Sequence, residues 1–227
     1  MSRLGRPRSF DRDEALASAM NLFWARGYEG ATLTDLQRAM GGITAPSFYA
    51  AFGSKEKLFR EAVALYSKTD GAPMARTLTE EPTARASIEG LLCAAADSFS
   101  QPGKPRGCLL LLGAINCMPA NQSVQNHMRD QRVPRQKLIL QRLQRGVTEG
   151  DMPAGANLKA LAAFYIAVVD GLSIQARDGA SRKSLRATVD CAMAAWNPLV
   201  SERTPVRLST PPSGNTTPND KSPRIVD

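Results

Sequence analysis

The chain has 227 residues, of which 43% are hydrophobic, which is enough to bury the core of one moderate domain or of two small ones. No run reaches the roughly 18 consecutive apolar residues of a membrane span, and the first residues lack the apolar stretch of a secretory signal, so we expect a soluble, cytoplasmic protein. The formal net charge of +8 favours a polyanionic partner, because a basic surface concentrates phosphate groups.

The residues that carry most enzyme chemistry are scarce. The only histidine is His127, and the sequence has neither a nucleophile elbow nor a glycine-rich phosphate loop. The cysteines are spaced too unevenly for paired metal ligands or a dense disulfide framework; they are Cys93, Cys108, Cys117 and Cys191. We interpret them as reduced core residues, with a redox-sensing thiol as the alternative. The sequence therefore argues against an enzyme, and we expect no cofactor and no bound metal.

Four short helices are predicted in the first 70 residues. Apolar residues recur at helical spacing from Leu16 to Phe23, after acidic residues that suit a helix start, and Gly27 should end this helix. The second helix begins at the N-cap Thr32 and runs to residue 40, before two glycines. The third covers residues 45–51 and tolerates Pro46 in its first turn. The fourth restarts at residue 54.

Longer helices are predicted beyond residue 80. Stripes of apolar residues indicate helices over residues 83–99, 108–116, 122–149, 158–176 and 185–196, and Pro134 should kink or divide the third of these. No segment alternates with period two. We therefore predict an all-α fold of about nine helices, followed from residue 201 by a disordered tail rich in Pro, Ser and Thr.

Basic residues are concentrated in two clusters. Residues 1–12 hold four Arg against one Asp, beside the short N-terminal helices. Residues 129–145 hold six Lys or Arg against one Asp, which we interpret as a solvated helix face rather than a second binding surface.

The second and third helices, joined by a glycine turn and preceded by basic residues, follow the plan of a helix-turn-helix DNA reader. Phe48 and Phe52 are four residues apart and should pin the third helix to a small core, with Ile43 and Leu36 beneath them. The outer face is then left to small side chains and a tyrosine; these residues are Ala45, Ser47 and Tyr49.

Residues 9–60, above all TLTDL at 32–36 and ITAPSFYAAFGSKEKLF at 43–59, closely resemble the DNA-binding domain of the tetracycline-repressor (TetR/AcrR) family. The resemblance implies phosphate contacts from Tyr49 and Lys55, and from Thr34 and Thr44 at helix starts. It implies that Ala45, Pro46 and Ser47 face base edges, and that Arg6 and Arg8 form an arm along the minor groove. Alternatively, Tyr49 only caps the small domain and Lys55 is a plain surface lysine. The chain departs from the common family pattern at Gly42, Pro46 and Ala51. These departures bear on which bases are contacted, and not on how the domain docks on DNA.

The resemblance also implies a larger C-terminal domain that binds an effector and dimerises through its last two long helices. For the dimer interface we expect mostly small residues that allow close helix approach; they are Ala162, Ala163, Ala167, Gly171, Ala192, Ala195 and Trp196. The alternative is that these residues only fill a monomer core. For the effector pocket we expect apolar residues, each of which could instead serve packing; they are Phe99, Leu111, Ile115, Met118, Met128, Phe164 and Val168.

The sequence thus predicts a DNA-binding domain at residues 8–60, a ligand-binding and dimerisation domain at residues 61–200 and a tail at residues 201–227. The function that we expect is repression from a palindromic operator on double-stranded DNA by a homodimer, relieved when a small-molecule effector moves the fourth helix like a lever. A DNA-binding protein that organises the chromosome without any ligand is the alternative, and an enzyme is the remote one.

Overall fold

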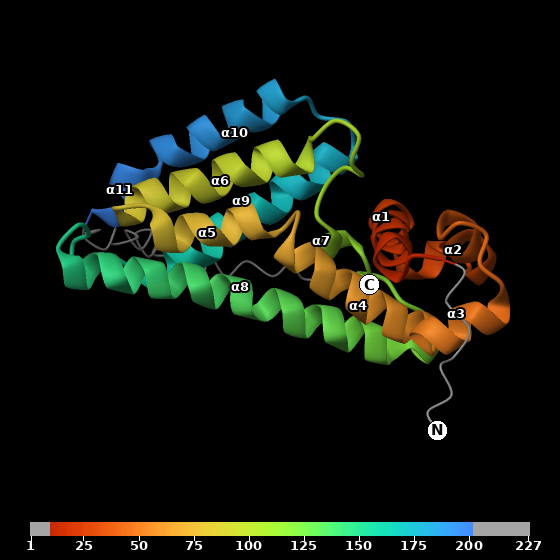
Figure 1. The fold of residues 1–227 in the computed structure, drawn as a ribbon. Helices are drawn as coiled ribbons and strands as arrows, with labels where there is room; N and C mark the ends of the chain where they lie inside the picture. Colours follow the sequence, from red (N-terminus) through yellow and green to blue (C-terminus); the bar gives the residue numbers. More distant parts are fainter. Residues whose placement is uncertain (1–9, 202–227) are drawn as a thin grey trace, which may run out of the picture.

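The computed structural model describes residues 10–201, and the regular elements in that part are all helices, which confirms the all-α prediction (Figure 1). Arg6 and Arg8 and the tail after residue 201 lie outside the described residues. The elements are α1 (Arg12–Gly30), α2 (Leu33–Ala39), α3 (Ala45–Phe52), α4 (Lys55–Lys68), α5 (Ala72–Glu80), α6 (Ala84–Phe99), α7 (Leu109–Leu112), the 3-10 turn η1 (Pro119–Asn121), α8 (Gln122–Glu149), α9 (Leu158–Arg177), α10 (Arg182–Ala194) and α11 (Trp196–Val200).

The short N-terminal helices begin at side-chain caps. The Thr32 hydroxyl accepts a hydrogen bond from the Asp35 N–H at 3.1 Å, and the Ser54 hydroxyl accepts one from the Lys57 N–H at 3.1 Å. These bonds satisfy N–H groups that have no partner within the helix. Gly27 interrupts α1 with φ 70° and ψ 175°, as the sequence predicts for the end of that helix. The local signals in this region are therefore sufficient to set the helix boundaries.

The longer helices form the body of the molecule. α5 packs on α6, α8 packs on α9, and α6 packs on both α9 and α10. In Figure 1 the helices α1 to α3 lie at one end of the molecule, and α4 runs from them into the body. We refer to α1 to α3 as the head and to the helices from α5 onward as the body. The core is continuous between the two, because the buried residues of the head, of α4 and of the body form one cluster; within it Phe59 of α4 lies 5.0 Å from Phe23 of α1 between ring centroids.

Two predicted helices differ from those in the structure. α8 is a single helix and is not divided at Pro134. Buried side chains on both sides of the proline, Met128 before it and Ile139 after it, hold the two halves on one body, so packing outweighs the lost hydrogen bond. The predicted helix at residues 108–116 shortens to α7, a single turn. The chain after that turn is held instead by α1, because the Tyr28 N–H donates to the Gly113 carbonyl at 2.7 Å.

The helix α5 is an element that the sequence analysis missed. It starts at Gly71 without any side-chain cap and has nine residues, of which Met74 and Leu78 are buried. Without a cap or a long periodic stripe, such a segment gives little signal before the body is assembled around it.

Residues 107–113 connect the head to the body, and we call them the connecting segment. The indole N–H of Trp24 donates to the Gly107 carbonyl at 2.9 Å, and the Tyr28 N–H binds Gly113. A Cβ atom on Gly27 would lie 3.3 Å from the Gly113 oxygen, which is tighter than nearly all such contacts. α1 and the connecting segment therefore leave little room for a side chain at residue 27.

The helix α9 is the one described helix whose length and composition would suit a membrane span. Its buried side includes Leu161, Tyr165 and Val169, which pack among α6, α8 and α10. Its other side exposes apolar residues, including Phe164 at 38% and Ile174 at 48%. The apolar character of α9 thus has two parts, one facing the core of the body and one facing outward.

We predict that Gly27→Ala lowers the free energy of unfolding by about 3 kcal/mol, because φ 70° with ψ 175° is a conformation essentially restricted to glycine and the new methyl meets Gly113. Gly41→Ala is the control. It also places alanine at a positive φ, 86°, but in open space, and should lower the free energy by only about 1 kcal/mol. Urea unfolding followed by circular dichroism measures both. Equal losses would contradict the close contact with the connecting segment.

Candidate nucleic-acid interface

The helix α3 is fixed to the head by one face. Phe48 and Phe52 are buried to 0% and 3% exposure, and Leu36 and Ile43 lie in the same core, as the sequence predicts. Arg12 reinforces this attachment: its guanidinium lies 4.6 Å above the Phe52 ring and pairs with Glu61 of α4 at 2.7 Å. One side of α3 is therefore immobilised against α1, α2 and α4, which leaves the other side free.

The free side of α3 carries the residues expected to face DNA. Ala45 and Pro46 are exposed, Ser47 is half-buried, and Tyr49 is 52% exposed although its ring packs edge-on against Phe48 at 5.3 Å. This exposure argues against the alternative that Tyr49 only caps the small domain. A short helix with small outward side chains can approach a groove about 12 Å wide closely.

Two threonines stand at the starts of α2 and α3. Thr44 is the N-cap of α3, and its hydroxyl donates to the Ser47 hydroxyl at 3.0 Å. Thr34 lies in the first turn of α2 and is exposed. Helix starts carry partial positive charge and free N–H groups, so both positions suit a phosphate oxygen.

The turn between α2 and α3 depends on its two glycines. Gly41 and Gly42 have φ values of 86° and 77°, the left-handed region that other residues rarely adopt. Gly42 departs from the common family pattern, and the structure gives it a conformational reason. The turn sets the angle at which α3 leaves α2, and so sets the direction in which the free side faces.

Lys55 is less free than a surface lysine. Its ammonium group lies 4.3 Å from the centroid of the Tyr28 ring, in a cation–π contact. Burial lowers the pKa of Lys55, while the nearby carboxylate of Glu29 acts in the opposite direction. Glu29 is itself held by the Met118 N–H at 2.9 Å and by the Asn121 amide at 2.8 Å, bonds that lower its pKa. Lys55 is thus positioned by α1 and by the chain that leads into α8.

Two basic residues near α3 were not singled out from the sequence. Arg38 is exposed on α2, and Lys57 is exposed in the first turn of α4. They lie within seven residues of either end of α3, so a count of the positive charges that flank this helix would have detected them.

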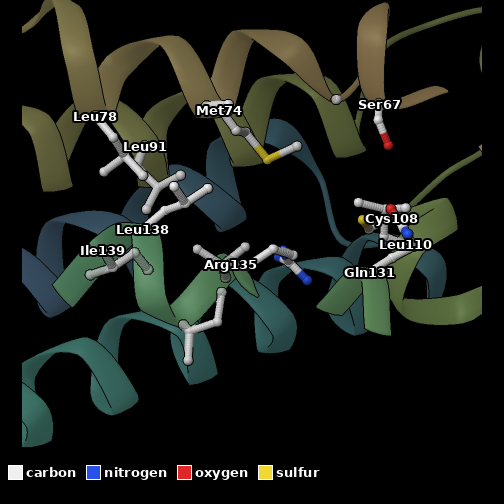
Figure 2. Close-up of a pocket in the computed structure, with 14 residues that line it drawn as sticks. Ser67, Met74, Leu78, Leu91, Cys108, Leu110, Gln131, Arg135, Leu138 and Ile139 are labelled. Carbon is white, nitrogen blue, oxygen red and sulfur yellow. The ribbon is translucent and has the colours of Figure 1, made fainter. Parts of the chain in front are cut away.

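A cavity of about 200 Å³ lies in the body, and we call it the body cavity (Figure 2). It is bounded by α4, α5, α6, α8, α9 and the connecting segment. Its lining consists of Ser67, Gly71, Met74, Ala75, Leu78, Leu91, Cys108, Leu110, Gln131, Arg135, Leu138, Ile139, Ile166 and Val169.

None of the seven residues expected for the effector pocket lines the body cavity. Phe99 and Met128 are fully buried at 0% exposure, and Leu111 is buried at 9%. Ile115, Met118 and Phe164 are exposed at 41%, 64% and 38%, and Val168 is half-buried. Phe164 and Val168 lie on α9, as do Ile166 and Val169, which face the cavity. The expected pocket and the body cavity therefore share this helix but use different sides of it.

The charge cluster on α8 also needs correction. Arg142 is buried at 2% exposure and donates to the Ser87 hydroxyl at 2.7 Å, while the Arg135 side chain is 17% exposed and lines the body cavity. The interpretation of residues 129–145 as a solvated face is therefore wrong for these two arginines. It holds for Arg129, whose side chain is 62% exposed.

The small residues expected at a dimer interface divide into two sets. Ala163 and Ala167 are exposed, Gly171 and Ala195 are partly exposed, and a Cβ on Gly171 would meet nothing within 4 Å. Ala162, Ala192 and Trp196 are buried at 0%, 7% and 5% and belong to the core of their own chain. The outward stripe on α9 is thus Ala163, Ala167, Gly171 and Ile174, at helical spacing.

Comparison with known proteins identifies relatives over nearly the whole chain. The model of the bacterial regulatory proteins of the tetR family matches residues 15–62. The HTH-type transcriptional repressor ComR of Escherichia coli K12 is 32% identical over 197 residues, which cover 86% of this chain and 93% of ComR. BdcR of the same organism, also an HTH-type transcriptional repressor, is 30% identical over 200 residues, which cover 87% of this chain and 95% of BdcR.

A solved structure agrees with these relatives. The TetR family regulator CifR, as a cysteine mutant complexed with 26-bp double-strand operator DNA, superimposes with a TM-score of 0.82 at 44% sequence identity. The match covers 85% of this chain and 100% of that CifR chain. The resemblance at residues 9–60 therefore extends through the body, and the protein belongs to the TetR family of bacterial regulatory proteins.

Proposed function

We propose that the protein is a homodimeric transcriptional repressor that binds a palindromic operator through α3 and leaves it when a small molecule occupies the body cavity. The DNA-binding domain would comprise residues 8–60 and the ligand-binding and dimerisation domain residues 61–200, with α4 passing through the boundary between them. Operator binding requires a location with the chromosome, so we place the protein in the cytoplasm.

The free side of α3 carries this proposal. A helix of eight residues is held by two buried phenylalanines, while Ala45, Pro46 and Tyr49 face outward. In a helix-turn-helix protein this helix enters the major groove, and residues at its start contact base edges. The small side chains favour close van der Waals contact, with water-mediated contacts supplying part of the sequence preference. The relatives named as repressors, and CifR bound to operator DNA, support the same role.

The outward stripe on α9 supports a homodimer. Ala163, Ala167 and Gly171 would let α9 of a second copy approach closely, and Ile174 would gain burial. A second copy would cover an apolar face that is otherwise in contact with water. Two heads related by a two-fold axis then match two half-sites of a palindrome, about 34 Å apart on one face of the duplex.

Release of DNA would follow from the position of the body cavity. Ser67 lies at the end of α4, and Cys108 and Leu110 lie in the connecting segment. A ligand in the cavity would therefore contact α4 and the connecting segment, the two elements that join the cavity to the head. α4 packs on α1 through Phe59, and the connecting segment is hydrogen-bonded to Trp24 and Tyr28. A small displacement of α4 or of the connecting segment would rotate α3 relative to the α3 of the second copy. This coupling is reciprocal, so operator DNA would weaken effector binding by the same factor.

The alternative function is that of a chromosome-organising protein, which would use the same head to bind DNA but would bind no ligand. The body cavity, with its volume of about 200 Å³ and largely apolar walls, favours the ligand-regulated protein, because a purely structural body would fill that space.

The test is selection of DNA by the full-length protein from a pool of random 26-bp duplexes. This is the length of the operator in the CifR complex. We expect enrichment of one palindrome, with an affinity at least about 10³-fold above that for unselected duplex. Enrichment of A·T-rich sequence without symmetry would support the chromosome-organising alternative. No binding to any duplex would refute both.

We predict that Lys55→Ala weakens binding to every duplex and lowers the slope of log K against log salt by about one unit per protomer, because one phosphate contact is lost. Lys68→Ala is the matched control. It removes the same charge from the other end of α4, about 20 Å along the helix axis. Thermal unfolding of both variants is recorded, since Lys55→Ala also loses the Tyr28 contact. A slope that stays at the wild-type value would leave Lys55 only the structural role on Tyr28.

We predict that Ala167→Glu converts the dimer to monomers at micromolar concentration, because a carboxylate would be buried in the middle of the outward stripe. Operator affinity should fall by at least about 100-fold, since two heads no longer bind together. Ala64→Glu makes the same change at another exposed helical alanine, on α4, and should leave the dimer intact. Sedimentation velocity measures the mass. A dimeric Ala167→Glu variant would exclude this face as the interface.

A further inference from the structure

The body cavity has one charged residue among the 14 that line it, and that residue is Arg135. In Figure 2, Met74, Leu78, Leu91, Leu138 and Ile139 gather at one end of the cavity, and Ser67, Cys108 and Gln131 lie at the other together with Leu110. Arg135 lies between the two groups, with its nitrogen atoms directed toward the second. The cavity therefore has an apolar end and a polar end.

The guanidinium of Arg135 is only partly used by the protein. Its Nη1 donates to Asp170 of α9 at 3.1 Å. Within residues 10–201, Nε and Nη2 have no hydrogen-bond acceptor within bonding distance, although the side chain is only 17% exposed. A guanidinium carries five N–H donors, so this group retains the geometry for a second, bidentate carboxylate.

The charges around Arg135 sum to a positive value. Arg132 lies three residues earlier on α8, so the two arginines share a helix face, and Arg132 donates to the carbonyl of Leu110, a lining residue, at 3.3 Å. Burial lowers the pKa of Arg132, and Asp170 opposes that shift. The nearby Asp70 is already paired with Lys104 at 3.0 Å. Two guanidinium groups thus share one carboxylate, Asp170, which is already paired with Arg135.

We infer that the effector is a small monocarboxylate whose carboxylate binds Arg135 and Gln131 while its hydrocarbon part lies against Met74, Leu78 and Leu91. This inference rests on the proposed repressor function, since it names the ligand class of the same cavity. An anion balances the excess positive charge, and a hydrocarbon part matches the apolar end. A volume of about 200 Å³ holds on the order of seven groups the size of a water molecule, so the ligand is of the size of hexanoate or benzoate.

The experiment measures binding of hexanoate, octanoate and benzoate to the full-length dimer at pH 7.5 by calorimetry, each beside its amide. The amides have the same shape without the charge. We expect at least one acid to bind, with its amide at least about 10-fold weaker. Equal binding of acid and amide, or no binding of any acid, overturns the inference.

Three variants determine where the acid binds and why. Arg135→Gln should weaken binding of the acid by about 30-fold or more, as the loss of one member of a buried charge pair does. Asp170→Asn should tighten it several-fold, because Arg135 no longer shares its charge. Arg129→Gln, an exposed arginine on the same helix, should leave it unchanged. If Arg135→Gln and Asp170→Asn shift the affinity in the same direction, the pair is a structural tie between α8 and α9 and the inference fails.

A fourth variant and a DNA measurement separate this inference from the proposed function. Ala75→Phe adds a ring to the cavity wall from an exposed position and should abolish acid binding, while an unchanged affinity would place the acid elsewhere and overturn the inference. The selected duplex is titrated with each variant in the absence of acid. Operator binding by wild-type protein without any acid binding would overturn the ligand class and leave the repressor function standing. Acid binding without operator binding would overturn the repressor function and leave the carboxylate site standing.

Discussion

The contact between the end of α1 and the connecting segment determines how the head sits on the body. The Tyr28 N–H reaches the Gly113 carbonyl at 2.7 Å, and this distance is possible because Gly27 has no side chain to hold the backbones apart. Trp24 adds a second bond, to Gly107, at the other end of the segment. Cys108 and Leu110 lie between these two bonds and also line the body cavity, so the same stretch of chain contacts both α1 and the cavity. A ligand that displaces Cys108 or Leu110 would therefore act on the same segment that is bonded to α1.

Positive charge has different functions in different parts of the molecule. Arg38 on the head and Lys57 at the start of α4 are exposed and suit long-range attraction to a phosphate backbone. Arg12 lies over the ring of Phe52 within the head, and Lys55 lies over Tyr28 and ties α4 to the head. In the body, Arg142 is buried and bonded to Ser87. The net charge of +8 signals a polyanionic partner, but only part of it faces such a partner.

The head could be predicted from the sequence because its determinants are local. The cap Thr32 and the paired Phe48 and Phe52 act within a few residues and have the roles that their spacing predicts, and the fourth helix starts where the sequence restarts it, at Ser54. The roles of single residues were less predictable, since the cation–π contact of Lys55 depends on Tyr28, which is distant in sequence.

The body was predicted only as a set of helices. Which face of α8 or α9 lines the cavity depends on how several helices pack, and periodicity does not encode this; Val168 was chosen where Val169 lines the wall. The same limit hid Arg135, which resembles its solvated neighbours in sequence. Pro134 was expected to kink or divide α8, yet buried side chains on both sides keep that helix whole.

The wall formed by α5 has a consequence for how the cavity fills. This helix has nine residues, follows Gly71 without a side-chain cap, and buries Met74 and Leu78 against the body. Helices this short have little stability of their own, so α5 can unfold locally at a lower free energy than the long helices around it. Its amide hydrogens should be among the first of the body to exchange with solvent. Such openings would widen a ligand's access to the cavity without disturbing the head.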